Sequence, residues 1–108
     1  MNRKTWTRAG LLLAMALPLV ARAEVDKKVE KLWKTKCASC HGADGKAQTE
    51  QGQKLGVRDY TSPEWQKAHT DEAIRKGISD GVQGMEGYKD KLSAEQIDQL
   101  VQFVRTLK

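Results

Sequence analysis

One run of five residues constrains this chain more than any other feature: Cys37-Ala38-Ser39-Cys40-His41. It contains both cysteines of the chain and one of its two histidines. CxxCH is the attachment signature of c-type haem. The two thiols add to the two vinyl groups on one edge of the porphyrin, and the next residue then places an imidazole on the iron. One short turn would therefore make three bonds to one cofactor.

Three other interpretations of the motif are open. A structural zinc site needs about four ligands, and only His69 remains among Cys and His outside the motif. A dithiol oxidoreductase normally places its CxxC in a βαβ context, and no alternating strand pattern precedes Cys37. A short-loop disulfide leaves His41 unexplained. We therefore favour one haem c, with its iron, held by Cys37, Cys40 and His41.

Residues 1–23 have the pattern of a secretory signal peptide. Three basic residues precede an apolar run over residues 9–20, and Ala21-Arg22-Ala23 follows as an A-x-A cleavage site. The run is shorter than the roughly 20 residues that span a bilayer, although an uncleaved anchor is the alternative. We predict cleavage after Ala23, a domain over residues 24–108, and a periplasmic location.

The formal net charge of +5 does not indicate nucleic-acid binding. Four basic residues and no acidic ones lie in residues 1–23, so residues 24–108 are close to neutral. They form neither a basic stripe nor a set of interleaved exposed aromatics. A chain this small also gains from a cofactor or another stabilising group in its core.

Helical patterns begin and end the predicted domain. Val25, Val29 and Trp33 are spaced as the apolar side of a helix that leads into the CxxCH turn. The charged residues of that helix fall on its other face: Asp26, Lys27, Glu30, Lys31 and Lys34. Near the other end, Ser93 and Gln96 form a capping box that opens a helix over about 94–107.

The centre of the chain has shorter signals. Ser62 followed by proline predicts a helix over 63–68, and Thr70 followed by two acids predicts a helix that stops near Gly81. Residues 42–56 contain four glycines and no apolar periodicity, so we predict a loop there. The fold class is therefore all-α, with four to five helices and no convincing strand.

At this point the chain resembles a known family, class I cytochrome c of the small single-haem bacterial periplasmic type. The resemblance covers residues 24–108. It rests on the motif with Gly42 after it, on Trp33 four residues before the first cysteine, on the segment Met85–Ser93, and on Leu100, Phe103 and Val104 in the last helix. It implies terminal helices that cross and a haem pocket with one edge towards solvent.

The resemblance also implies that His41 and a methionine are the axial ligands of the iron. Met85 is the only methionine in residues 24–108, and glycines flank it. His69 is the other candidate for the sixth position, and an open position is the third possibility. Thioether ligation favours Fe(II) and raises the reduction potential.

Three features depart from the common family pattern. Val29 stands where many members have glycine, which predicts either a slightly wider helix crossing or a shifted register. Glu86 follows the methionine where many have proline, which suggests a Met85 loop that opens more easily. No proline lies between His41 and Pro63, so the usual carbonyl acceptor for the His41 ring N–H is missing.

The function that follows is a one-electron carrier between redox partners, such as a membrane or periplasmic reductase and oxidase of a respiratory chain. It is not expected to be an enzyme, since no general base or nucleophile is evident. We expect a monomer with no stable membrane insertion after cleavage. Two alternatives are a haem subunit of a larger respiratory complex, and a haem sensor or peroxidase in which Met85 dissociates.

Overall fold

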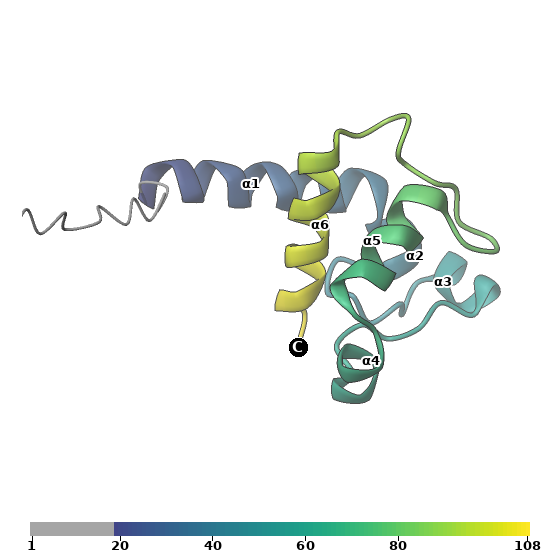
Figure 1. Ribbon diagram of the computed structural model, residues 1–108. Coiled ribbons are helices and arrows are strands. Elements are labelled where there is room, and N and C mark those ends of the chain that lie inside the picture. The colour runs from purple at the N-terminus through teal and green to yellow at the C-terminus, as the bar shows by residue number, and fades with distance from the viewer. Residues whose placement is uncertain (1–18) are drawn as a thin grey trace, which may run out of the picture.

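The computed structural model describes residues 19–108, so most of the predicted signal peptide lies outside the described residues. This part of the chain contains six helices and no strand, which confirms the all-α class (Figure 1). In chain order the helices are α1 (Leu19–Lys36), α2 (Ala38–His41), α3 (Glu50–Leu55), α4 (Pro63–Ala68), α5 (Asp71–Asp80) and α6 (Ala94–Thr106). Within residues 19–108, no helix has both the length and the apolar character needed to cross a membrane.

The core forms where α1 and α6 cross, as Figure 1 shows. Val29 and Trp33 of α1 are buried there together with Leu100, Val101 and Val104 of α6. Burying a large apolar side chain stabilises a fold by about 1.5–3 kcal/mol relative to leaving it exposed. This contact holds the two ends of the domain together, and Val29 is part of it.

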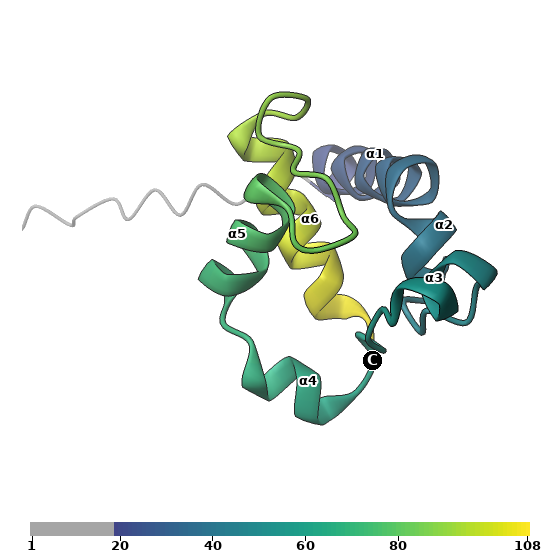
Figure 2. The ribbon, with the colours of Figure 1, turned by 90° about the vertical axis from the view of Figure 1, so that its right-hand side faces the viewer.

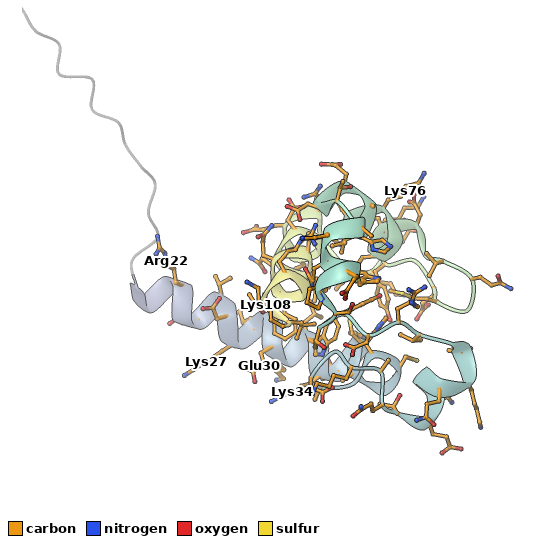
Figure 3. All side chains as sticks on the ribbon, turned by 90° about the horizontal axis from the view of Figure 1, so that it is seen from below. Arg22, Lys27, Glu30, Lys34, Lys76 and Lys108 are labelled. Carbon is orange, nitrogen blue, oxygen red and sulfur yellow. The ribbon has the colours of Figure 1, made fainter. Side chains whose placement is uncertain are left out.

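The polar face of α1 lies where the sequence predicted it. Lys27, Glu30 and Lys34 project from the helix into solvent (Figure 3). Glu30 and Lys34 are one helical turn apart, and their charged atoms are 3.1 Å from each other. Such an exposed pair contributes little to stability, so α1 is held mainly by its apolar face.

Side chains at the N-caps explain where the central and last helices begin. Ser62 accepts a hydrogen bond from the Trp65 amide, and Thr70 accepts one from the Ala73 amide. Ser93 and Gln96 form the predicted reciprocal capping box. These caps satisfy amides that lack intrahelical partners, and they confirm the predicted starts of α4, α5 and α6.

The predicted loop over residues 42–56 is wrong in its second half, where α3 forms. Thr49 caps this helix by accepting a hydrogen bond from the Gly52 amide, and Gly56 ends it with a left-handed φ of 66°. Gly52 is needed because a Cβ there would lie 2.2 Å from the Cys40 carbonyl oxygen. A helix with only a glycine buried has no apolar stripe, so periodicity did not reveal it.

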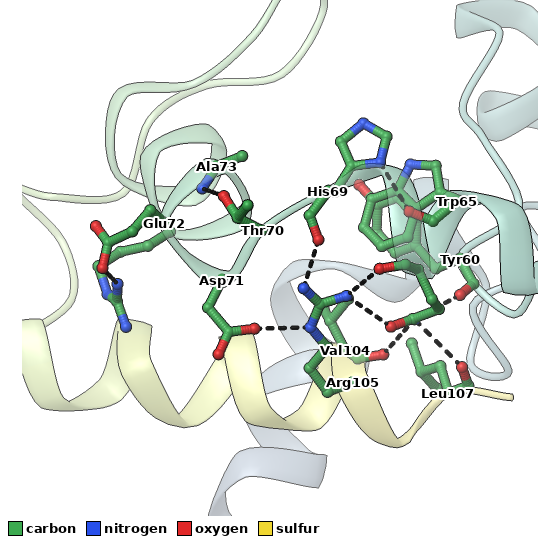
Figure 4. Close-up of polar contacts among 12 residues, drawn as sticks. Tyr60, Trp65, His69, Thr70, Asp71, Glu72, Ala73, Val104, Arg105 and Leu107 are labelled. Carbon is green, nitrogen blue, oxygen red and sulfur yellow. Dashed lines mark hydrogen bonds and ion pairs between the residues drawn. The ribbon is translucent and has the colours of Figure 1, made fainter.

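A polar clamp joins the region around α4 to the end of α6 (Figure 4). The Arg105 guanidinium donates to the Asp71 carboxylate at 2.7 Å, to the Gln66 carbonyl at 2.7 Å, and to the His69 carbonyl. The Gln66 side chain in turn donates to the carbonyls of Tyr60 and Val104, at 2.7 and 3.0 Å. The clamp therefore supplies donors to the carbonyls of Gln66 and His69 at the end of α4, and it adds donors to those of Tyr60 and Val104.

We expect Arg105→Met to lower the free energy of unfolding by about 1.5–3 kcal/mol, the range for hydrogen bonds to charged groups. The matched control is Arg75→Met, because within residues 19–108 Arg75 bonds only the side chains of Glu72 and Asp98, at the surface. Urea denaturation of both variants measures the difference. Equal losses for the two arginines would show that the carbonyl contacts add nothing.

Candidate cofactor site

The CxxCH turn begins where α1 ends. The Cys37 amide donates to the Trp33 carbonyl at 2.8 Å, and the His41 amide donates to the Cys37 carbonyl at 2.9 Å. The Trp33 indole N–H donates to the Gly42 carbonyl at 3.0 Å. Trp33 thus fixes both the start and the end of the motif, which explains the aromatic residue four positions before the first cysteine.

His41 is nearly enclosed, with 7% of its surface exposed. Its ring stacks on the Tyr60 ring at a centroid distance of 4.7 Å. The Trp33 ring is tilted relative to the His41 ring, and their centroids are 5.6 Å apart. Burial lowers the pKa of His41 because the charged form loses hydration. The imidazole is therefore neutral near pH 7, which is the form that binds metals.

The Nδ1 atom of His41 is buried and has no hydrogen-bond partner among the described residues. This agrees with the sequence, which has no proline between His41 and Pro63 to supply a carbonyl acceptor. An imidazole with unused bonding capacity in a buried position calls for a partner outside the chain.

Both cysteines of the motif are free thiols that are partly buried. Burial raises the pKa of Cys37 to about 11, and the neighbouring Cys40 adds to this rise. Cys37 is therefore a protonated thiol near neutral pH. A neutral thiol without a disulfide partner is available to form a thioether.

All of the predicted site residues border a single cavity of about 620 Å³. Cys37, Cys40 and His41 lie on its wall, and so do Met85 and His69. The volume is within the range of about 300–1,000 Å³ that is typical of ligand and cofactor sites. Figure 2 shows the elements that surround it, with α2 and α3 on one side and α5 on the other.

The residues around this cavity fit a covalently attached haem. They supply two thiols, a neutral imidazole and a thioether, and apolar side chains such as Ile74, Leu100 and Val104 complete the wall. Among residues 19–108, no three side chains of His, Cys, Asp or Glu come together as a metal-binding group. The two thiols, the imidazole and the thioether are the kinds of group that attach a haem c and bind its iron.

His69 occupies a defined position in the wall. Its ring stacks on Trp65 at a centroid distance of 4.5 Å, and its Nδ1 lies 2.9 Å from the Trp65 carbonyl oxygen. The cavity includes both His69 and Met85, so it does not by itself choose between them as ligands. His69 would have to leave Trp65 in order to move.

Tyr60 is the site residue that the sequence analysis missed. It lies between His41 and Trp65, with a ring distance of 4.2 Å to the latter. Its amide donates to the Gly45 carbonyl at 2.9 Å, which fixes it against the loop after the motif. Tyr60 is a lone aromatic residue in a segment without apolar periodicity, so the sequence did not indicate that its ring packs on His41.

Burial of Tyr60 predicts a stability loss at alkaline pH. Burial raises the pKa of Tyr60 to about 12. An unfolded tyrosine ionises near pH 10, so between about pH 10 and 12 the unfolded chain loses a proton that the folded protein keeps. The free energy of unfolding should fall with rising pH over this window. Urea denaturation at several pH values measures the fall.

The Tyr60→Phe variant is the control for this prediction. It has no phenol to ionise, so its stability should fall less steeply between about pH 10 and 12. Parallel pH profiles for the two proteins would contradict the role of Tyr60.

Comparisons with known proteins agree with this geometry. Residues 24–104 match the family described as cytochrome C oxidase, cbb3-type, subunit III. A solved structure titled KustC0563 c-type cytochrome is 39% identical, with a TM-score of 0.70, over 73% of this chain and 95% of that chain. A tyrosine-to-phenylalanine mutant of Kustc0563 is 38% identical, with a TM-score of 0.68, over 74% of this chain and 98% of that chain. A comparison with curated proteins found no match.

Proposed function

Since this chain belongs to the cytochrome c family described as cbb3-type cytochrome c oxidase subunit III, and carries a covalently bound haem c, we propose that it is a periplasmic one-electron carrier. Cys37 and Cys40 hold the haem, and His41 and Met85 are its axial ligands. One observation carries this proposal: the motif and the only methionine of residues 24–108 border the same cavity.

Each residue has a distinct task in this proposal. Cys37 and Cys40 fix the cofactor at the end of α1, and neutral His41 binds on one side. Met85 supplies a thioether, which favours the reduced iron. The haem itself supplies the one-electron change between Fe(III) and Fe(II). With His41 and Met85 both holding the iron, the one-electron change would require little reorganisation of the chain.

The aromatic wall supports this role by holding His41. Tyr60 and Trp33 contact the His41 ring from two directions, so the imidazole has little freedom to turn. Trp65 and Tyr88 also border the cavity. An iron with both positions taken by His41 and Met85 would suit a carrier better than an enzyme, because a substrate would need an open position on the iron.

The first experiment is mass spectrometry of protein purified from the periplasm of cells that attach haem c. We expect a chain that begins at Glu24 and carries one haem, because the A-x-A site lies just before it. A Cys40→Ser variant should lose one of the two thioether bonds. An unprocessed chain would contradict the signal peptide, and a haem-free chain would contradict attachment at the motif.

A second candidate function is a haem subunit of a larger oxidase, which the family description favours. The charged surface does not separate it from a free carrier, because basic residues near the cavity pair with acids. Lys54 lies 3.3 Å from Glu50, and Lys91 lies 2.5 Å from Glu86. Size-exclusion chromatography of natively purified protein decides the matter: a monomer supports the free carrier, and stable co-purification with membrane subunits supports the oxidase.

A further inference from the structure

The loop that carries Met85 is closed by its own backbone. The Met85 amide donates to the Val82 carbonyl at 2.8 Å, and the Val82 amide donates to the Met85 carbonyl at 3.2 Å. Gly84 turns the chain between them with a φ of 84°. The loop is therefore a tight hairpin that begins directly after α5.

Two glycines join this hairpin to the end of α5. A Cβ on Gly81 would lie 2.6 Å from the Met85 carbonyl oxygen and 2.7 Å from the Gly87 nitrogen. A Cβ on Gly87 would lie 2.6 Å from the Ser79 carbonyl oxygen and 2.6 Å from the Asp80 carbonyl carbon. All of these atoms belong to the backbone, so no side chain can move aside. Only glycine allows these two segments of the backbone to approach each other this closely.

Hydrogen bonds continue the contact past the glycines. The Tyr88 amide donates to the Ile78 carbonyl at 2.9 Å, and the Lys89 amide donates to the Ser79 carbonyl at 3.1 Å. These carbonyls are in the last turn of α5, where intrahelical partners are lacking. The chain that leaves the Met85 loop therefore completes the end of the helix that enters it.

Tyr88 also connects this loop to the haem-attachment motif. Its side chain is 8% exposed, and its hydroxyl donates to the Lys36 carbonyl at 3.3 Å. Lys36 is the last residue of α1 and precedes Cys37. The two segments that carry the proposed ligands are thus joined directly.

From these contacts we propose that Gly81 and Gly87 are positioning residues for Met85. Together with the amides of Tyr88 and Lys89 they form a backbone clasp, which holds the loop closed and keeps the thioether at the sixth position. The clasp takes over the stiffening that a proline after Met85 would give. This inference rests on the proposed function, because it assumes that Met85 is the ligand.

The Gly87→Ala variant tests the clasp. Gly87 does not have a positive φ, so the added methyl acts only through its clash with the end of α5. The haem stays attached through the cysteines, and its spectrum therefore reports on the sixth position. We expect loss of the long-wavelength sulfur-to-iron absorption band in the ferric protein. In the reduced protein, CO should bind about tenfold faster or more than in the wild type.

Lys76→Ala is the control within α5. Lys76 is exposed and lies off the cavity wall, and alanine favours a helix at least as well as lysine. This variant should keep the band and the slow CO binding. Loss of the band in both variants, or in neither, would overturn the proposal.

Hydrogen exchange on the wild-type protein gives a second test that needs no variant. The Tyr88 and Lys89 amides should exchange at least about 100-fold more slowly than that of Gln83 at the exposed loop tip. Equal exchange rates would overturn the clasp even if Gly87→Ala fails to mature. If the wild-type protein lacks the sulfur band, the failure lies with Met85 ligation and so with the proposed function, whereas a wild-type band that survives Gly87→Ala refutes the clasp alone.

Discussion

Replacing Met85 by alanine is expected to abolish the long-wavelength sulfur-to-iron band of the ferric protein and to lower its reduction potential. Axial ligands set haem potentials over a range of about 0.8 V, and loss of the thioether removes the ligand that favours Fe(II). The shift should therefore be on the order of tenths of a volt. Optical spectra and a redox titration of the two proteins measure both effects.

His69→Ala is the control for this experiment. His69 borders the same cavity but is held against Trp65, so its removal should leave the band in place. A wild-type protein that is low-spin without the band, and that changes only in His69→Ala, would make His69 the ligand. A high-spin wild-type spectrum with rapid CO binding would instead favour a sensor or peroxidase.

Leu100→Ala is expected to lower the free energy of unfolding by about 2–5 kcal/mol. Leu100 is 1% exposed and lies at the crossing of α1 and α6, so its truncation leaves a cavity in the core. That loss is a large fraction of the 5–15 kcal/mol that typically stabilises a small domain. Urea denaturation of the haem-bound protein measures it.

The same substitution at Leu55 is the matched control. Leu55 is 48% exposed at the end of α3, so truncation there removes little buried surface and should cost far less. Comparable losses at the two positions would show that the helix crossing does not dominate stability. It would also count against a fold held mainly by the contact between its terminal helices.

Local signals in the sequence predicted most of the secondary structure. Ser62, Thr70 and Ser93 each marked a helix start, because the oxygen that caps a helix belongs to a residue next to it in the chain. The cap signals of α3, Thr49 and Gly56, were just as local. They lay in a glycine-rich stretch without apolar spacing, and this stretch was therefore predicted as a loop.

Some residues of the candidate site could also be predicted from the sequence, and others could not. Attachment at Cys37, Cys40 and His41 could be predicted because its chemistry depends on spacing within one turn. Met85 could be proposed because no other methionine remains in residues 24–108. Tyr60 could not, since nothing near it in the sequence indicates that its ring stacks on His41.

By itself, the sequence determined the attachment motif, the helix starts and the all-α class, because each depends on residues that are close together in the chain. Only the tertiary structure decided which residues line the cavity and which backbone contacts close the Met85 loop. The clamp at Arg105 and the clasp between Gly81 and Gly87 depend on backbone atoms brought together by folding. Backbone carbonyls and amides are chemically alike at nearly every position, so no residue pattern indicates which of them will contact each other in the folded chain.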